Sequence, residues 1–324
     1  MTHIFRFATG SALAVLLSTT AHAEEVTMRY LASHGGLSAH ELAQELGFFE
    51  GTGITLENLG YASGGPESLM ALAGGSVEIG SAATSAVLNS IIGGNDFVAA
   101  YPTQGINDQV QSIFYVLEDS PIQGIEDLPG KTIAVNTLGA HLDYTVREAL
   151  HQAGLPQNAA NLLTVPGPQL EQVLRSGQVD VAAFGYWQTT FEGAARQGGG
   201  IRPIFDDTDV LGEIAGGFTV LRRDWVDAHP EAARIWVEQS ARALDHAREH
   251  SDEVREIIAR ALEARGENPE VAAFFAGYGV REGGRAIPRD IDFWIGVLER
   301  EGKLQPGQLS ARDVLLPDAQ VAAK

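Results

Sequence analysis

The sequence predicts an α/β protein made of two lobes, each a mainly parallel β-sheet flanked by helices, with a cleft between them. Three observations lead to this prediction. Segments rich in β-branched and aromatic residues alternate with amphipathic helical segments, a pattern typical of parallel sheets covered by helices. The alternation occurs in two successive runs, and 324 residues are enough for about two domains. No linker rich in proline and serine separates the runs, which disfavours two independent domains on a string.

The N-terminal segment has the layout of a secretory signal peptide. Residues 1–23 contain Arg6, a short apolar run at 12–17 and the small-x-small sequence Ala21-His22-Ala23. The apolar run is far shorter than the ~18 residues that a membrane-spanning helix requires. We therefore expect cleavage just before Glu24 and release into the bacterial periplasm. With Arg6 removed, the mature net charge would be −20 − 1 = −21.

The first run of elements begins at residue 26. Strands are expected over residues 26–32, 54–59, 77–80 and 96–101. Helices are expected between them. One starts near Ser38 and ends at the glycines of 51–53, one begins at Pro66, and one ends near Ile92.

The second run repeats the pattern and is followed by helices. Strands are expected over residues 110–117, 132–135, 162–165, 179–184, 201–205 and 216–221. Helices are expected over residues 140–153, 170–174 and 189–196. Beyond Asp224 the pattern is helical, with charged amphipathic stretches at 231–248 and 251–265, and a loose tail after Gln305.

The junctions between the two runs are short, at residues 102–107 and 212–217. This arrangement favours one unit inserted into the other, with residues 24–103 and 217–324 forming lobe 1 and residues 104–216 forming lobe 2. Two short crossings between lobes are typical of a hinge, with a cleft where the strand ends of the two sheets face each other.

Composition excludes several classes of function. A formal net charge of −20 argues against a nucleic-acid-binding protein, which needs a basic surface. The absence of cysteine excludes a cysteine nucleophile, a thiolate zinc site, an iron–sulfur cluster and disulfide bonds. Gly130-Lys131-Thr132 resembles the end of a phosphate-binding loop, but Ile125 occupies the position that needs the first glycine, and Lys131 leads into a strand. We therefore expect no nucleotide hydrolase.

No motif predicts catalysis or a metal site. Residues 246–250 read His-x-x-Glu-His, but the surrounding charges are those of a solvated helix face and no third ligand is evident. His40-Glu41 begins a zinc motif that Gln44 breaks. We expect no cofactor and no metal.

Turns of small residues recur at strand ends, each leading into a helix. They lie at residues 33–36, 63–66, 82–85 and 137–140. Unpaired backbone N–H groups and the positive helix end at such turns bind anions without lysine or arginine. Each turn alone is more simply a helix cap. Because three fall in one lobe and one in the other, a ligand cleft is the better interpretation.

These segments also carry a family resemblance. The sequences ELGFFEGTGITLE (45–57), ALAGGSVEIGSAATSA (71–86) and DLPGKTIAV (127–135) are its most specific parts. The mature chain resembles the periplasmic sulfonate/taurine/nitrate-type solute-binding proteins of ABC importers. The resemblance implies a type II-like two-lobe periplasmic-binding-protein fold that closes on a small-molecule ligand. It also implies a monomer whose closed form docks on an inner-membrane permease served by a separate ATPase.

The resemblance implies ligand-facing residues at the same turns. In lobe 1 these are Ser33, His34, Gly36, Gly64, Gly65, Thr84 and Ser85; in lobe 2 they are Thr137, Gly139, Ala140, His141, Tyr186 and Trp187. In a taurine-type site an acidic group would pair with the ligand ammonium, and Asp206 is the candidate for that role. Trp187 suits the cleft wall and the core equally well.

Several functions remain open at this point. The leading interpretation is a non-catalytic periplasmic receptor that delivers a small organic anion or zwitterion, such as a sulfonate or taurine, to an ABC permease. A second is a receptor for a pyrimidine, flavin-like or aromatic carboxylate ligand stacked on Tyr186 and Trp187. A third is an enzyme on the same fold, although similar pyrimidine-precursor synthases rely on a cysteine- and histidine-rich segment that this chain lacks. A fourth is a sensory module that presents its ligand to a membrane receptor.

Overall fold

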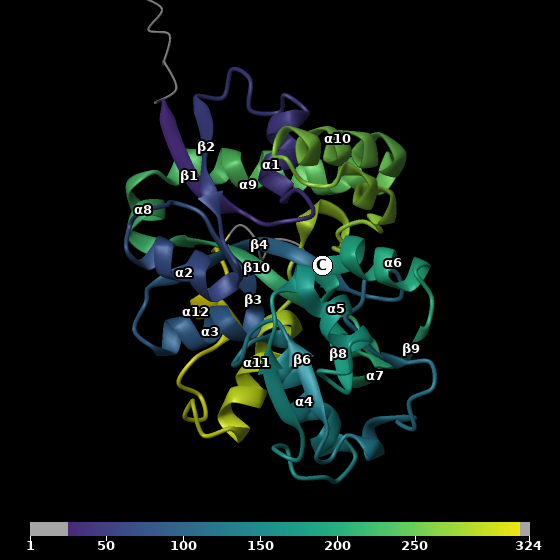
Figure 1. Cartoon of the computed structure of the whole chain (residues 1–324). Coiled ribbons are helices and arrows are strands. Elements are labelled where there is room, and N and C mark those ends of the chain that lie inside the picture. The colour runs from purple at the N-terminus through teal and green to yellow at the C-terminus, as the bar shows by residue number, and fades with distance from the viewer. Residues whose placement is uncertain (1–24, 318–324) are drawn as a thin grey trace, which may run out of the picture.

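The computed structural model describes residues 25–317, which form two lobes joined side by side (Figure 1). The expected signal peptide lies outside the described residues. In lobe 1, β1 (Val26–Ala32) pairs with β2 (Ile54–Tyr61) in parallel, and β10 (Ile214–Arg222) lies between β3 (Gly80–Ala83) and β4 (Phe97–Ile106). The carbonyl oxygen of Arg29 accepts hydrogen bonds from the N–H groups of Glu78 (3.0 Å) and Ile79 (3.1 Å). These bonds place β1 beside the segment that leads into β3.

Lobe 2 contains a five-stranded sheet in the order β7-β6-β8-β5-β9. Its strands are β5 (Ile113–Leu117), β6 (Thr132–Val135), β7 (Asn161–Thr164), β8 (Val181–Phe184) and β9 (Ile201–Asp206). β5 runs antiparallel to both neighbours, and β10 does so in lobe 1. β4 carries the chain out of lobe 1 and β5 follows it in lobe 2, whereas β10 carries the chain back, so β5 and β10 each enter their sheet from the opposite end. The predicted α/β class is confirmed, with one reversed strand in each lobe.

Helices cover the sheets. Those of the first lobe are α1 (Ala39–Glu45), α2 (Gly65–Ala73), α3 (Thr84–Ile92), α8 (Arg223–Ala228), α9 (Pro230–Glu249), α10 (Ser251–Ala264), α11 (Arg289–Arg300) and α12 (Ala311–Val314). Those of the second are α4 (His141–Gln152), α5 (Leu170–Arg175), α6 (Thr189–Gln197) and α7 (Asp207–Leu211). The expectation that everything after Asp224 is helical is wrong for residues 265–288, which hold only the short 3₁₀ turns η4 (Pro269–Phe274) and η5 (Glu282–Gly284). No helix within residues 25–317 is both long and apolar enough to cross a membrane.

The two crossings between lobes lie side by side. β4 and β10 pair antiparallel from Phe97 opposite Arg222 to Ile106 opposite Ile214. The predicted lobe boundaries fall inside these two strands, and the division itself stays a prediction. One core cluster includes Leu88 of α3, Leu142 of α4 and Trp294 of α11, so buried apolar contact is continuous from one lobe to the other.

A segment that we call the strap, residues 275–290, crosses both of these strands. The carbonyl oxygen of Tyr278 accepts a hydrogen bond from Gly105 N of β4 (2.8 Å). The carboxylate of Asp290, which is fully buried, accepts one from Ala215 N of β10 (2.9 Å) and one from Arg281 (2.7 Å). The strap therefore ties the C-terminal helices to the backbone of both crossings.

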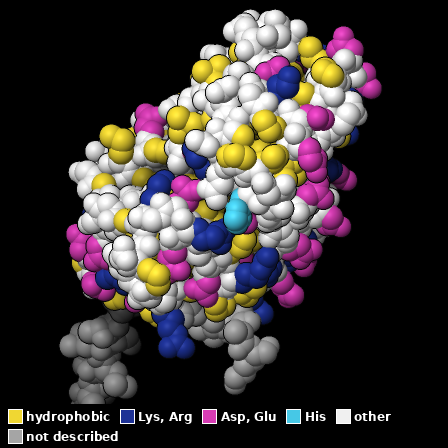
Figure 2. All heavy atoms as spheres, turned by 90° about the horizontal axis from the view of Figure 1, so that it is seen from below, with side chains coloured by type: hydrophobic (Ala, Val, Ile, Leu, Met, Phe, Trp, Pro, Cys, Tyr) yellow, Lys and Arg dark blue, Asp and Glu magenta, His cyan; other side chains and the backbone are white. Residues whose placement is uncertain are grey.

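The surface carries most of the charge. The face in Figure 2 shows acidic side chains along one flank, with basic side chains and a histidine nearer its centre. This distribution agrees with the formal net charge of −20 and with a surface of mixed sign rather than a single basic patch.

Candidate functional site

A cleft of about 190 Å³ lies between the lobes. Lobe 1 contributes the turns around residues 33–38 and 62–66 and the strand β3. Lobe 2 contributes Asn136, Ala140, the 3₁₀ turn η3 (Tyr186–Gln188) and the start of α6. Thr103 and Gln104 of the crossing strand β4 line it as well. The cleft is therefore built by residues from both lobes and from the connection between them.

More than half of the predicted site residues line this cleft. They are Ser33, His34, Gly36, Gly64, Gly65, Ala140, Tyr186 and Trp187. Tyr186 is buried, and its ring occupies the space that side chains on Gly216 and Gly217 of β10 would need. Burial and the charge of Asp207 raise the pKa of the Tyr186 hydroxyl well above its ordinary value, so this group remains a hydrogen-bond donor.

Thr84, Ser85 and His141 do not line the cleft. All three are fully buried, because the first turns of α3 and α4 direct these side chains into the protein. The hydroxyl of Thr84 donates to the carbonyl oxygen of Ala215 (3.2 Å) and so joins α3 to β10. His141 Nε2 lies 2.8 Å from Asp207 Oδ2, and Asp207 Oδ1 accepts a hydrogen bond from Ser112 N (2.8 Å).

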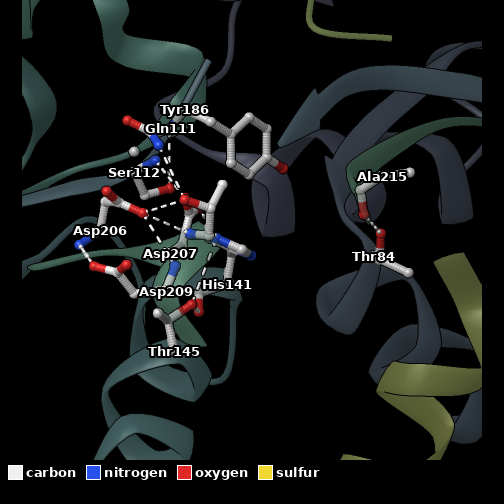
Figure 3. A network of polar contacts seen from close by, with 12 residues as sticks. Thr84, Gln111, Ser112, His141, Thr145, Tyr186, Asp206, Asp207, Asp209 and Ala215 are labelled. Carbon is white, nitrogen blue, oxygen red and sulfur yellow. Dashed lines mark hydrogen bonds and ion pairs between the residues drawn. The ribbon is translucent and has the colours of Figure 1, made fainter. Parts of the chain in front are cut away.

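Figure 3 shows the buried network around His141 and Asp207. The His141 ring lies edge-on to Tyr186, with centroids 5.0 Å apart and an interplanar angle of 82°. The ring of Tyr186 is directed toward the side where Thr84 and Ala215 lie. The backbone N–H of Tyr186 donates a hydrogen bond to Ser112 Oγ (3.0 Å). His141 and Asp207 thus hold the residue that forms part of the cleft wall.

Asp206, Thr137 and Gly139 also lie outside the lining. Asp206 is the N-cap of α7, and its carboxylate accepts hydrogen bonds from the N–H groups of Thr208 (2.9 Å) and Asp209 (3.2 Å). It therefore does not present an acceptor for a ligand ammonium in the cleft. The hydroxyl of Thr137 is 3.1 Å from Asn136 Nδ2, and the carbonyl oxygen of Gly139 accepts from Asn89 Nδ2 (3.0 Å).

Three helix N-termini open on the cleft. The N-cap residues of α2, α3 and α4 are Gly64, Ala83 and Ala140; all three line the cleft, and none makes a side-chain capping hydrogen bond. The ends of α2 and α3 touch, since a methyl group on Gly65 would lie 2.7 Å from the Cβ atom of Ala82. A methyl group on Gly64 would lie 3.3 Å from the hydroxyl oxygen of Thr137, which precedes α4 in the chain. The positive ends of three helices from two lobes therefore meet.

The side chains around the cleft are almost all uncharged. Among the described residues that line it there is no lysine or arginine, and Glu41 is the single carboxylate. Glu41 is itself bound by Arg265 (2.6 Å), by Ser38 N (2.7 Å) and by Ser38 Oγ (2.8 Å). Burial lowers the pKa of His40 to about 4, so its ring is neutral at pH 7.

Several lining residues carried no local signal in the sequence. Tyr278 donates its hydroxyl hydrogen to the carbonyl oxygen of Leu37 (2.9 Å), a partner more than two hundred residues earlier in the chain. Thr190 of α6 donates to the carbonyl oxygen of Gly35 (3.2 Å), and the Phe191 ring packs against the same glycine. Only the tertiary fold brings these residues to the cleft.

The lobes touch at both ends of the cleft. At one end Gly35 of lobe 1 meets Thr190 and Phe191 of lobe 2, and at the other Gly64 meets Thr137. The structure therefore describes a closed arrangement. Within residues 25–317 no group of three or more histidine, aspartate or glutamate side chains is placed to hold a metal ion.

Solved structures share this fold at low sequence identity. The periplasmic aliphatic sulphonate-binding protein SsuA from Escherichia coli aligns with a TM-score of 0.70 and 20% identity, covering 92% of this chain and 94% of that one. The alkanesulfonate-binding protein SsuA from Xanthomonas axonopodis pv. citri, bound to MOPS, aligns with a TM-score of 0.71 and 20% identity, covering 90% and 99%. A mutant of the desulfurization enzyme DSZB in complex with biphenyl-2-sulfinic acid aligns with a TM-score of 0.63 and 18% identity, covering 90% and 97%.

These alignments confirm the two-lobe periplasmic-binding-protein fold that the resemblance implied. A sequence comparison with curated proteins gives no match. The family model described as NMT1/THI5 like matches residues 38–254, which include most of both lobes and the residues of the cleft from Ser38 to Phe191. The chain belongs to the NMT1/THI5-like family.

Proposed function

We propose that this protein is the periplasmic solute-binding component of an ABC importer, which captures a small organic anion in the cleft and delivers it to a membrane permease. The observation that carries this proposal is the meeting of three helix N-termini without side-chain caps, two from lobe 1 and one from lobe 2. Backbone N–H groups at helix N-termini bind anions without any cationic side chain.

The charge of the anion is best placed near α3. The first turns of α2 and α4 contain acidic residues, Glu67 and Asp143, whereas the first turn of α3 contains none. Glu67 already accepts hydrogen bonds from Ser63, and Asp143 accepts one from Gly139 N. An anion at α3 that also reaches α4 would bridge the lobes only when they are closed, so its binding would shift the population toward the closed state.

The names of the similar structures agree with this proposal. The SsuA proteins bind sulfonates, as their names say, and the structure from Xanthomonas contains MOPS. The signal-peptide layout of residues 1–23 favours the periplasm, and the importer role would require a permease and a separate ATPase. The fold is also that of the enzyme DSZB. We favour binding over catalysis, because the sequence contains no cysteine. Ser38 Oγ lies 3.0 Å from His40 Nε2 in the cleft, but the Ser38 hydroxyl donates its hydrogen to Glu41 Oε2 (2.8 Å), so His40 is not placed to accept it as a base.

A thermal-shift screen of the mature chain from Glu24 tests the proposal. The panel contains alkanesulfonates, taurine, nitrate, bicarbonate, pyrimidines and aromatic carboxylates, added after removal of any co-purified ligand. A ligand at 100 times its dissociation constant adds about 2.7 kcal/mol of stability, which gives a shift of a few degrees. We expect shifts with organic anions. Shifts with neutral pyrimidines alone would contradict the proposal.

A pair of variants tests the position of the anion. Ala83→Asp places a negative charge at the N-terminus of α3, and Ala83→Asn places a neutral group of the same size there. Aspartate and asparagine are both favourable N-cap residues, so both variants should fold. We expect the Asp variant to bind the anion at least roughly tenfold more weakly than the Asn variant, because only its charge repels the ligand. Equal affinities would show that the anion does not lie at α3.

A further inference from the structure

We propose that the ligand of this cleft is an organic monoanion that carries one uncharged ring, and that the cleft rejects analogues with an ammonium group. This inference rests on the proposed binding function and specifies the other end of the ligand. It follows from the separation of the cleft into an anion end and an aromatic end, from the occupation of both oxygens of Glu41, the single carboxylate among the described lining residues, and from the volume of the cleft.

The anion end is the cluster of N-termini of α2, α3 and α4. The aromatic end surrounds the turn at residues 33–38. There Phe191 packs against Gly35, and Tyr278 donates to the carbonyl oxygen of Leu37. The Phe275 and Tyr278 rings lie edge to face with centroids 5.2 Å apart, and all three aromatic residues line the cleft.

The aromatic end is suited to a ring. Phe191 comes from lobe 2, whereas Phe275 and Tyr278 belong to the segment that follows α10, so aromatic surface is presented from both sides of the closed cleft. Aromatic pairs in edge-to-face or offset arrangements contribute about 0.5–1.5 kcal/mol beyond the burial of apolar area. A ligand ring would gain this contribution, and a short aliphatic chain would not.

The described residues that line the cleft offer an ammonium group no free carboxylate. Both oxygens of Glu41 are bound, one by Arg265 and the other by Ser38. Glu267 does not line the cleft; its Oε2 accepts from Gly35 N (2.9 Å) and lies 3.3 Å from His34 Nδ1, and its Oε1 is buried without a hydrogen-bond partner among the described residues. Asp206 caps α7, and Asp207 is paired with His141. Burial of an ammonium without a counter-charge is strongly unfavourable.

The volume of the cleft suits a ligand with a single ring. An apolar cavity of about 150 Å³ holds a benzene molecule. At about 190 Å³ the cleft accommodates one such ring together with a small acid group. Fused multi-ring ligands such as flavins exceed this space. The flavin-like alternative that the sequence left open is therefore disfavoured.

Calorimetric titration of the mature chain tests each part of the inference with matched pairs of ligands. Ethanesulfonate and taurine differ only in the ammonium group, and benzenesulfonate and ethanesulfonate differ in the ring. Benzoate and benzenesulfonate differ in the acid group and identify which acid the anion end prefers. We expect taurine to bind at least roughly tenfold more weakly than ethanesulfonate, and benzenesulfonate at least roughly tenfold more tightly.

The outcomes separate this inference from the proposed function. Taurine binding as tightly as ethanesulfonate, or ethanesulfonate binding as tightly as benzenesulfonate, would overturn the inference while leaving an anion receptor. Naphthalenesulfonate binding more tightly than benzenesulfonate would overturn the limit to one ring. If no sulfonate, carboxylate or nitrate binds at all, the proposed function itself fails.

Two phenylalanine variants test the aromatic end directly. Phe191→Leu removes a ring that lines the cleft, and Phe205→Leu removes one that is stacked on Phe114 in the core of lobe 2, outside the cleft. We expect Phe191→Leu to lower the affinity for benzenesulfonate about fivefold more than the affinity for ethanesulfonate. Phe205→Leu should leave the ratio of the two affinities unchanged. An equal loss for both ligands in Phe191→Leu would contradict the assignment.

Discussion

Two glycines at the cleft differ in the space around them, so the same substitution should change protein stability differently at each. Gly65 packs against Ala82, where a methyl group would lie 2.7 Å from Cβ and 2.9 Å from Cα, whereas a methyl group on Gly36 would meet nothing within 4 Å. Overpacking costs about 1–3 kcal/mol, and replacing glycine by alanine in open space gains about 0.4–1 kcal/mol by restricting the unfolded chain. We expect Gly65→Ala to lower the free energy of unfolding in urea and Gly36→Ala to leave it unchanged or raise it. Equal effects of the two variants would contradict the packing argument.

The buried His40 makes the stability of lobe 1 depend on pH. Burial lowers its pKa from 6.5 to about 4, and its ring nitrogens lie 3.0 Å from Tyr101 Oη and from Ser38 Oγ. Between these pH values the unfolded chain binds a proton that the folded chain excludes. The contribution of His40 to the free energy of unfolding is therefore fully present above pH 6.5 and is lost as the pH falls through 4, by about 3–4 kcal/mol in total.

Urea unfolding at pH 7.5 and 4.5 measures this contribution. We expect the loss of stability on acidification to be smaller in His40→Gln than in the unmodified protein by about 2–3 kcal/mol, whatever the cost of the substitution itself. Replacement of His151, which is exposed, serves as the control. The same loss in His40→Gln and in the unmodified protein would rule out His40 as the group responsible.

At the scale of elements, the strap depends on one buried carboxylate. Asp290 accepts hydrogen bonds from Ala215 N, Ile287 N and Arg281. Loss of this acceptor leaves the N–H groups of Ala215 and Ile287 without a partner, at about 1–3 kcal/mol each, whereas an exposed ion pair contributes about 0–1 kcal/mol. We expect Asp290→Ala to lower the free energy of unfolding by the larger amount. Asp96→Ala, which removes the exposed partner of Arg223, should change it by less than about 1 kcal/mol. If Asp290→Ala lowers the free energy of unfolding no more than Asp96→Ala does, the Asp290 carboxylate does not hold the strap in place.

The sequence predicted elements where the pattern is local and missed those held by distant contacts. Alternation located β1, α4 and β6 to within a residue or two, because side-chain period and turn residues determine them. The stretch at 265–288 is charged enough to suggest helix, yet its backbone bonds to Gly105, and no short-range pattern encodes that partner. The reversal of β5 and β10 likewise depends on the direction of the crossings.

The residues of the candidate site also differ in whether local sequence or tertiary contacts bring them to the cleft. Gly64, Gly65 and Ala140 lie in turns of small residues, which mark helix N-termini in the sequence itself, and the family resemblance implied them as ligand-facing. Thr84 and Ser85 belong to such a turn, but the first helical turn directs their side chains inward. Phe191 and Tyr278 reach the cleft only through tertiary folding, so sequence periodicity could not identify them.

At the scale of the whole molecule, closure uses contacts outside the cleft. Asn89 of α3 donates its side-chain amide to the carbonyl oxygen of Gly139 (3.0 Å) and to the hydroxyl of Tyr144 (3.2 Å), so it ties lobe 1 to α4 of lobe 2. Lys303 also donates to Tyr144 (2.6 Å). Asn89 does not line the cleft. If the lobes separate between α3 and α4, these bonds exist only in the closed state and raise its population.

Asn89→Ala should therefore weaken ligand binding, although Asn89 does not line the cleft. The apparent dissociation constant equals the intrinsic one divided by the fraction of competent, closed molecules. Loss of two hydrogen bonds, each of about 0.5–1.5 kcal/mol, would raise the apparent dissociation constant by up to roughly a hundredfold. The ligand-free variant should also have a larger radius of gyration in small-angle scattering. Asn95→Ala is the matched control, because its amide donates to Ser90 within lobe 1. If both variants bind the ligand alike, the lobes do not separate at α3 and α4, and opening must occur at the other end, where Gly35 meets Thr190.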